Sequence, residues 1–144
     1  MNPNLLPSSV AQLAAAINPG AQAVGSASSG WVKMANFANL MVIIAAGTLG
    51  ASGTVDAKIE QATDASGTGV KDVSGKAITQ ITTSDKQAII NLSADDLDSN
   101  NGFLYARVTV TVGTADSDVA AMALGFDARY QPGSQVSSVL EVVS

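Results

Sequence analysis

The sequence predicts an all-β protein, an antiparallel β-sandwich of the jelly-roll or Greek-key kind with about eight strands and an extended N-terminal arm. Stretches rich in β-branched residues alternate apolar and polar positions, which is the period of a strand with one buried face. Turn-forming residues separate these stretches at intervals of roughly ten residues, a spacing typical of sandwiches and barrels. No convincing helical pattern occurs in residues 31–144.

The clearest strand is predicted over residues 103–112, which we expect at the centre of a sheet. One set of side chains has a strict period of two and faces the core: Leu104, Ala106, Val108, Val110 and Val112. The other set is Phe103, Tyr105, Arg107, Thr109 and Thr111. β-Branched and aromatic residues fit such a pleated, half-buried surface.

Residues 1–30 are predicted to form a separate arm ahead of a sandwich domain over residues 31–144. The arm holds three of the four prolines and no charged side chain. Within residues 8–17, Val10, Leu13, Ala14 and Ile17 share a helical face, so a short helix is expected there. The Gly, Ala and Ser residues at 20–30 have the composition of a flexible tether. A disordered terminus is the alternative.

The other strands of the domain follow in order. Strands are expected over residues 31–36, 40–46, 54–60, 77–83, 87–93, 119–130 and 136–143, with a loop at 64–75. The 40–46 run is apolar on both faces, which favours a strand covered on both sides. The 77–83 and 87–93 runs are read as a hairpin because only three residues separate them.

Composition restricts the function. With no Cys and no His, the usual catalytic triads, thiol nucleophiles and zinc sites are absent. A net charge of −5 with scattered Lys and Arg argues against direct nucleic-acid binding. The longest apolar run, residues 40–46, is too short to span a bilayer, and no basic residue of a secretory signal precedes Lys33. Charged residues make up only 13%, which suggests a surface covered by other subunits or a domain rich in neutral polar residues.

Two polar clusters are candidates for a binding or catalytic site. Asp96, Asp98 and Asn100 have the spacing that begins a calcium-binding loop, but the required Gly and bidentate Glu are missing, so a structural turn is favoured. Paired carboxylates such as Asp56 and Glu60 lack an aromatic-lined cleft for sugar and fit a solvated sheet face. We therefore expect no catalytic, metal or cofactor-binding residue, and no cofactor.

Candidate partner contacts are few. Arg129 and Tyr130 precede a Pro-Gly turn, where they could anchor a partner or cap the sandwich. Trp31, the only tryptophan, and two apolar residues of the arm, Leu13 and Ile17, complete the candidate set.

Three runs of the body, residues 37–48, 60–76 and 98–112, resemble short proteins encoded among the head genes of tailed bacteriophages. The chain is similar to the small auxiliary virion proteins of these phages, and in particular to capsid decoration (cement) proteins. The resemblance implies a structural protein without catalysis, made in the host cytoplasm and located on the capsid surface of the virion. It implies the major capsid protein as partner and a homo-oligomer, with a trimer favoured.

Two other readings stay open at this point. One is a different phage structural role, as a tail-tube or head–tail joining subunit. The other is a sugar- or calcium-binding β-sandwich module.

Overall fold

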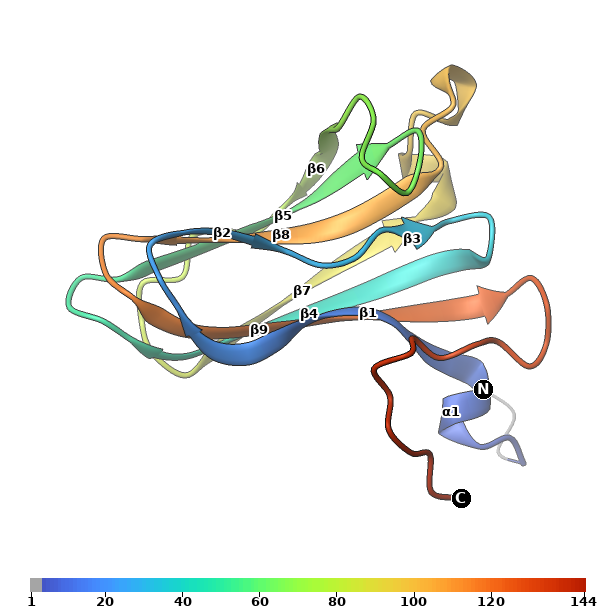
Figure 1. Ribbon diagram of the computed structural model, residues 1–144, viewed down its shortest axis with the longest axis horizontal. Coiled ribbons are helices and arrows are strands. Elements are labelled where there is room, and N and C mark those ends of the chain that lie inside the picture. Colours follow the sequence, from blue (N-terminus) through green and yellow to red (C-terminus); the bar gives the residue numbers. More distant parts are fainter. Residues whose placement is uncertain (1–3) are drawn as a thin grey trace.

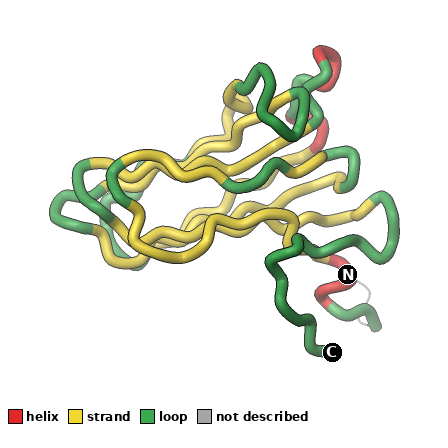
Figure 2. Tube along the Cα trace, viewed as in Figure 1, coloured by secondary structure: helices red, strands yellow, loops and turns green. Residues whose placement is uncertain are grey.

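The computed structural model describes residues 4–144 and folds them into two antiparallel β-sheets that pack face to face (Figures 1 and 2). The chain begins with α1 (Pro7–Val10), and two 3-10 turns, η1 (Ala94–Asp96) and η2 (Ser99–Asn101), precede β8. The strands are β1 (Ala11–Gln22), β2 (Gly25–Ser28), β3 (Val32–Lys33), β4 (Phe37–Leu49), β5 (Thr54–Ala62), β6 (Lys71–Ala77), β7 (Lys86–Ser93), β8 (Tyr105–Gly113) and β9 (Ser117–Ala128).

The strand order is that of a jelly roll. Sheet A has the order β1-β9-β4-β7, and sheet B has the order β2-β8-β5-β6, with β3 also pairing with β8. The antiparallel pairs are nested, since β1 pairs with β9, β2 with β8, β4 with β7, and β5 with β6. In a jelly roll, nested antiparallel pairs of this kind are divided between two sheets that pack against each other. The predicted sandwich is confirmed, with nine strands in the part of the chain described.

The core between the sheets is aliphatic, as a chain with few aromatics requires. Val42 and Ile44 of β4 and Val108 and Val110 of β8 are almost completely buried. Burying an aliphatic side chain of this size contributes about 1.5–3 kcal/mol. The core-facing positions of β8 are confirmed from Ala106 to Val112. Leu104 lies ahead of the strand and is exposed, and Thr109 on the opposite face is also buried.

The structure does not show the extended N-terminal arm. β1 pairs with β9 along one border of sheet A, and β2 pairs with β8 in sheet B, so residues 11–28 belong to the sandwich. The only helix here is the four-residue α1. The helix expected over residues 8–17 is wrong beyond Val10, because Leu13, Ala14 and Ile17 lie in β1. The register of β1 shifts between Leu13 and Ala15 and again between Ile17 and Gly20. These shifts break the strand alternation, which explains why the sequence pattern looked helical.

Three other expectations are corrected. The 77–83 run is not a strand of a hairpin. Ala77 ends β6, the rest of the run makes one bridge between Ile81 and Val55, and β7 pairs with β4 in the other sheet. The predicted 64–75 loop ends early because β6 begins at Lys71. Residues 136–143 form no strand and leave the sandwich as an irregular segment (Figure 2).

Candidate functional site

The outer face of sheet A is apolar across all four strands. Residues directly opposite each other in a ladder share a face, and one such row runs from Ala16 through Met122 and Ile43 to Ile89. Ile89 is 58% exposed and Met122 is 45% exposed. The neighbouring row contains Leu13, Leu124 and Met41 before it ends at Asn91.

This face is the part of the site that the sequence reasoning missed. The apolar positions of residues 40–46 on both sides were read as a strand covered on both faces. In the structure, Leu40, Val42 and Ile44 are buried in the core, whereas Met41 and Ile43 face outward and are only half-buried. No described helix or strand covers the centre of this face. The double-sided apolar run therefore marks a strand with one face in the core and an apolar face on the surface.

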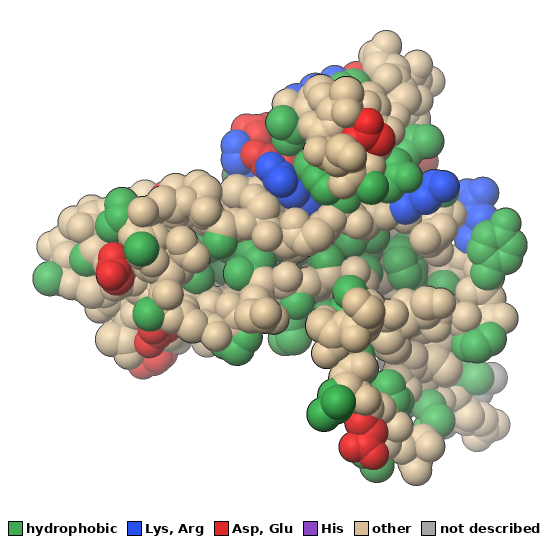
Figure 3. All heavy atoms as spheres, in the orientation of Figure 1, with side chains coloured by type: hydrophobic (Ala, Val, Ile, Leu, Met, Phe, Trp, Pro, Cys, Tyr) green, Lys and Arg blue, Asp and Glu red, His purple; other side chains and the backbone are tan. Residues whose placement is uncertain are grey.

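Charge is distributed very unequally between the two sheets. Only three charged residues occur in the strands of sheet A, each at or near a strand end: Lys86, Asp118 and Asp127. Sheet B holds eight: Lys33, Asp56, Lys58, Glu60, Lys71, Asp72, Lys76 and Arg107. In Figure 3 the Lys and Arg side chains on the visible face gather over sheet B and at the β3 end of the sandwich. The outer face of sheet B is therefore the solvated side, and that of sheet A is the side suited to burial.

An apolar groove of about 310 Å³ lies on the β1 side of this face. It is lined by Leu13, Ala16, Ile17, Asn18, Pro19, Ile43, Ala45, Ala120, Ala121, Met122 and Ser138. None of these residues is charged. Two sequence-predicted contacts, Leu13 and Ile17, are thus brought together here, although as strand residues of β1 rather than as a helix of an arm.

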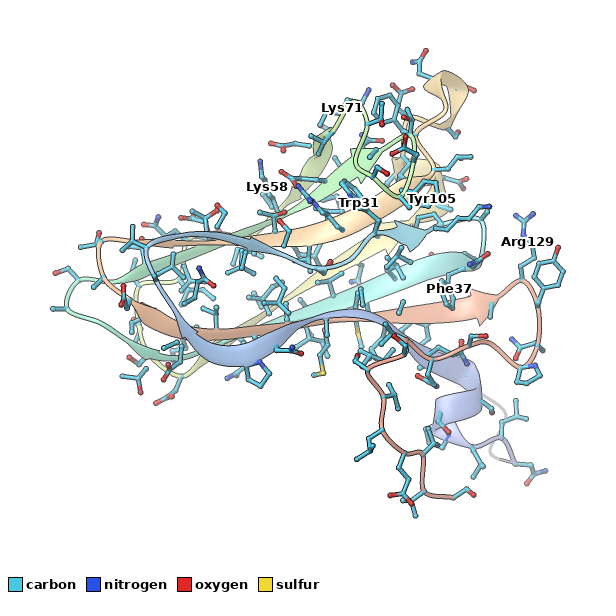
Figure 4. All side chains as sticks on the ribbon, in the orientation of Figure 1. Trp31, Phe37, Lys58, Lys71, Tyr105 and Arg129 are labelled. Atoms are coloured by element: carbon cyan, nitrogen blue, oxygen red, sulfur yellow. The ribbon has the colours of Figure 1, made fainter. Side chains whose placement is uncertain are left out.

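A second cleft, of about 450 Å³, lies between β3 and the segment that follows β9. Four of the six aromatic residues line it: Trp31, Phe37, Tyr105 and Tyr130. Trp31 lies in the link between β2 and β3, Tyr105 begins β8, and Phe37 begins β4 (Figure 4). No sequence pattern indicates such an aromatic cleft, because these residues lie far apart along the chain. Two predicted contacts, Trp31 and Tyr130, belong to it.

Arg129 does not join Trp31 and Tyr130. It points away from the cleft (Figure 4) and borders a separate shallow hollow with Met34 and Asp95. Its backbone N–H donates to the carbonyl of Asn36 at 2.9 Å. The five sequence-predicted contacts therefore divide among three places on the surface.

Trp31 is held by an ion pair on the outer face of sheet B. The Arg107 guanidinium lies 4.5 Å from the Trp31 ring centroid, and its Nε donates to Glu60 Oε2 at 2.8 Å. The Thr109 hydroxyl donates to the same oxygen at 2.8 Å. Burial alone would raise the pKa of the Glu60 carboxyl, but the hydrogen bonds from Thr109 and Arg107 and the charge of Arg107 outweigh it and lower that pKa. This network fixes the wall of the aromatic cleft.

The acidic turn after β7 is a structural turn. The Ser93 backbone N–H donates to Asp96, which also pairs with Lys76, and both contacts lower the pKa of Asp96. Asp98 accepts hydrogen bonds from Lys71 and Asn101, which lower its pKa in the same way. The described residues contain no group of three or more acidic side chains able to hold a metal ion. The carboxylates of this turn are engaged by lysines and by neighbouring amides.

Comparison with models of known protein families and with curated proteins finds no match for this chain. Within residues 4–144, no helix has the length and apolar character needed to cross a membrane.

Proposed function

We propose that this chain is a structural protein of a tailed-phage virion, which binds the assembled capsid as a decoration protein and acts without catalysis. The observation that carries the proposal is the apolar outer face of sheet A, whose strands carry charge only at or near their ends. The phage assignment itself depends on the resemblance of residues 37–48, 60–76 and 98–112. The jelly roll is compatible with it by analogy, since this architecture occurs in capsid and lectin domains.

The size of the face fits a protein partner. Four strands spaced about 4.8 Å apart and ten residues long cover roughly 600 Å². A typical specific interface buries about 800 Å² on each partner, so the face together with its rim is large enough. Large apolar patches on soluble domains mark such contacts. A subunit of the capsid shell is the partner that we assign to it.

The proposed role is mechanical. A protein that binds only the intact shell stabilises that state, by about 2.7 kcal/mol per site when its concentration is a hundred times the dissociation constant. Many copies on one shell would raise its resistance to heat and to internal pressure. The contact should persist at moderate salt, because it is apolar rather than ionic.

The test is to strip the protein from purified particles, add it back, and record the temperature at which DNA is released. We expect particles that carry the protein to release DNA at a higher temperature than stripped ones. Equal release temperatures would contradict the decoration role and favour the alternative role as a tail-tube or joining subunit. Copy number per particle separates these two roles, since decoration requires hundreds of copies.

The aromatic cleft supports a second candidate, the sugar-binding module. Aromatic rings with nearby amides and hydroxyls, such as those of Trp31, Tyr105, Asn36 and Gln135, can hold a saccharide by stacking and hydrogen bonds. Trp31 is the only tryptophan, so its fluorescence reports this cleft alone. Saturable changes in Trp31 emission on titration with oligosaccharides would favour this candidate, and unchanged emission would remove it.

A further inference from the structure

Residues 137–144, the exposed segment, carry two apolar side chains, Leu140 and Val143, that lie almost entirely in solvent. Leu140 is 98% exposed and Val143 is 84% exposed. In an extended segment Leu140 and Val142 would lie on one side, and Val139, Glu141 and Val143 on the other. Large apolar side chains exposed next to one another in this way suggest a contact with a partner.

The segment leaves the sandwich at the free edge of β1. The Val136 N–H donates to the Leu13 carbonyl at 2.7 Å, and the Leu13 N–H donates to Gln135 Oε1 at 2.6 Å. Pairing with the edge then stops, because a turn closed by the Val139 N–H and the Val136 carbonyl directs the chain away. Figure 1 shows the end of the chain running away from both sheets.

The apolar groove of sheet A lies beside this point. Ser138 forms part of its wall, and Ala16, Ile43, Ala120 and Met122 line it from three strands. The groove is uncharged, and four of the eight residues of the exposed segment are aliphatic, with Glu141 as its one charged residue.

We propose that the groove of one copy receives the exposed segment of a second copy. Leu140 and Val142 would enter the groove, Glu141 would face solvent, and the segment backbone would pair with the open edge of β1. This inference rests on the proposed function, in which the outer face of sheet A binds protein. It names a second copy as the partner for the β1 side of the face and leaves the β7 side, around Ile89, for the shell.

A second copy fits better than the chain's own segment. For Leu140 to reach the groove of its own chain, the turn at residues 136–139 would have to open, because Ser138 already lies at the groove wall. A neighbour's segment needs no such change. Each copy offers one groove and one segment, so the contact is head to tail and can close into a ring such as a trimer.

The test uses two complementary variants and sedimentation velocity. A chain lacking residues 137–144 keeps the groove but has no segment to donate. Ala16→Glu places a charge in the groove and keeps the segment; Ala120→Glu serves if the first substitution impairs folding, which thermal melts would show. We expect the wild-type chain to self-associate, each variant alone to be monomeric, and an equimolar mixture of the two to form a one-to-one complex.

Three outcomes would overturn the inference. The first is a wild-type chain that stays monomeric even at roughly 1 mM, which is far above a micromolar dissociation constant. The second is a deletion variant that assembles like wild type. The third is a mixture of the two variants that stays monomeric. No shell is present in this assay. If self-association fails while the protein still binds shells, the proposed function survives and only the inference is lost. Self-association without shell binding would support the contact between copies and contradict the proposed function.

Discussion

Replacing Glu60 by Gln should destabilise the fold in a manner that depends on pH. The side chain of Glu60 is 12% exposed and accepts hydrogen bonds of 2.8 Å from Arg107 and Thr109. Gln at this position keeps the shape but loses the charge, and its amide NH₂ cannot accept a hydrogen bond. Arg107, stacked on Trp31, would lose its ionic partner.

The size and the sign of the effect follow from these contacts. Hydrogen bonds to a charged group contribute about 1.5–3 kcal/mol, so we expect a loss of about 2 kcal/mol at pH 7. For a chain of this length that corresponds to roughly 4–8 °C in Tm. Because the folded pKa of Glu60 is lowered, its carboxylate stabilises the fold fully above the unfolded pKa of about 4.3. That stabilisation disappears as the pH falls through the folded pKa.

The assay is urea unfolding of wild type and Glu60→Gln across the range from neutral to acidic pH. Glu141→Gln, on the exposed segment, removes the same charge without these contacts and is the control. The difference between wild type and Glu60→Gln should be largest at neutral pH and should shrink in acid. A difference that is independent of pH, or no larger than that of the control, would refute the reasoning.

Two further substitutions test the packing. Val110→Asp buries an unpaired carboxylate in the core and should abolish cooperative thermal unfolding. Thr111→Asp, on the outer face of sheet B, should lower the free energy of unfolding by less than about 1.5 kcal/mol. Equal destabilisation by both substitutions would contradict the assignment of faces. Gly125→Ala should lower stability by about 1–3 kcal/mol in urea unfolding, because a Cβ there would lie 2.5 Å from the Phe37 ring. The matched control is Gly20→Ala, where nothing lies within 4 Å, and a similar loss in both would argue against tight packing at Phe37.

Strands with unbroken alternation could be predicted from the sequence. β5 and β8 keep a period of two along their length, since each pairs with a neighbour in regular register from Thr54 opposite Gly113 to Ala62 opposite Tyr105. β1 could not be predicted, because its two register shifts break that period and its many Ala residues favour a helix in isolation. β1 forms a strand because it pairs with the second edge of β9, and this long-range pairing overrides the local preference of its residues for helix.

The candidate site could be predicted only in part. Trp31 and Tyr130 line the aromatic cleft, and Leu13 and Ile17 line the apolar groove, but the sequence could not show that they belong to different hollows. Which strands neighbour each other is a long-range property, and no local pattern encodes it. For the same reason, the apolar row through Met122 and Ile89 becomes visible only when β9, β4 and β7 are placed side by side.

The most direct measurement of the central proposal is the affinity of surface variants for stripped shells. Ile89→Glu places a charge at the exposed centre of the β7 side of sheet A, and Ser74→Glu places one at an exposed position of β6 in sheet B. Burying an isoleucine side chain contributes about 1.5–3 kcal/mol, so Ile89→Glu should weaken binding by at least about tenfold. Ser74→Glu should bind within about twofold of wild type, because surface substitutions away from a contact change the free energy by at most about 0.5 kcal/mol. If Ile89→Glu binds like wild type while both variants remain folded, the outer face of sheet A is not the surface that binds the shell.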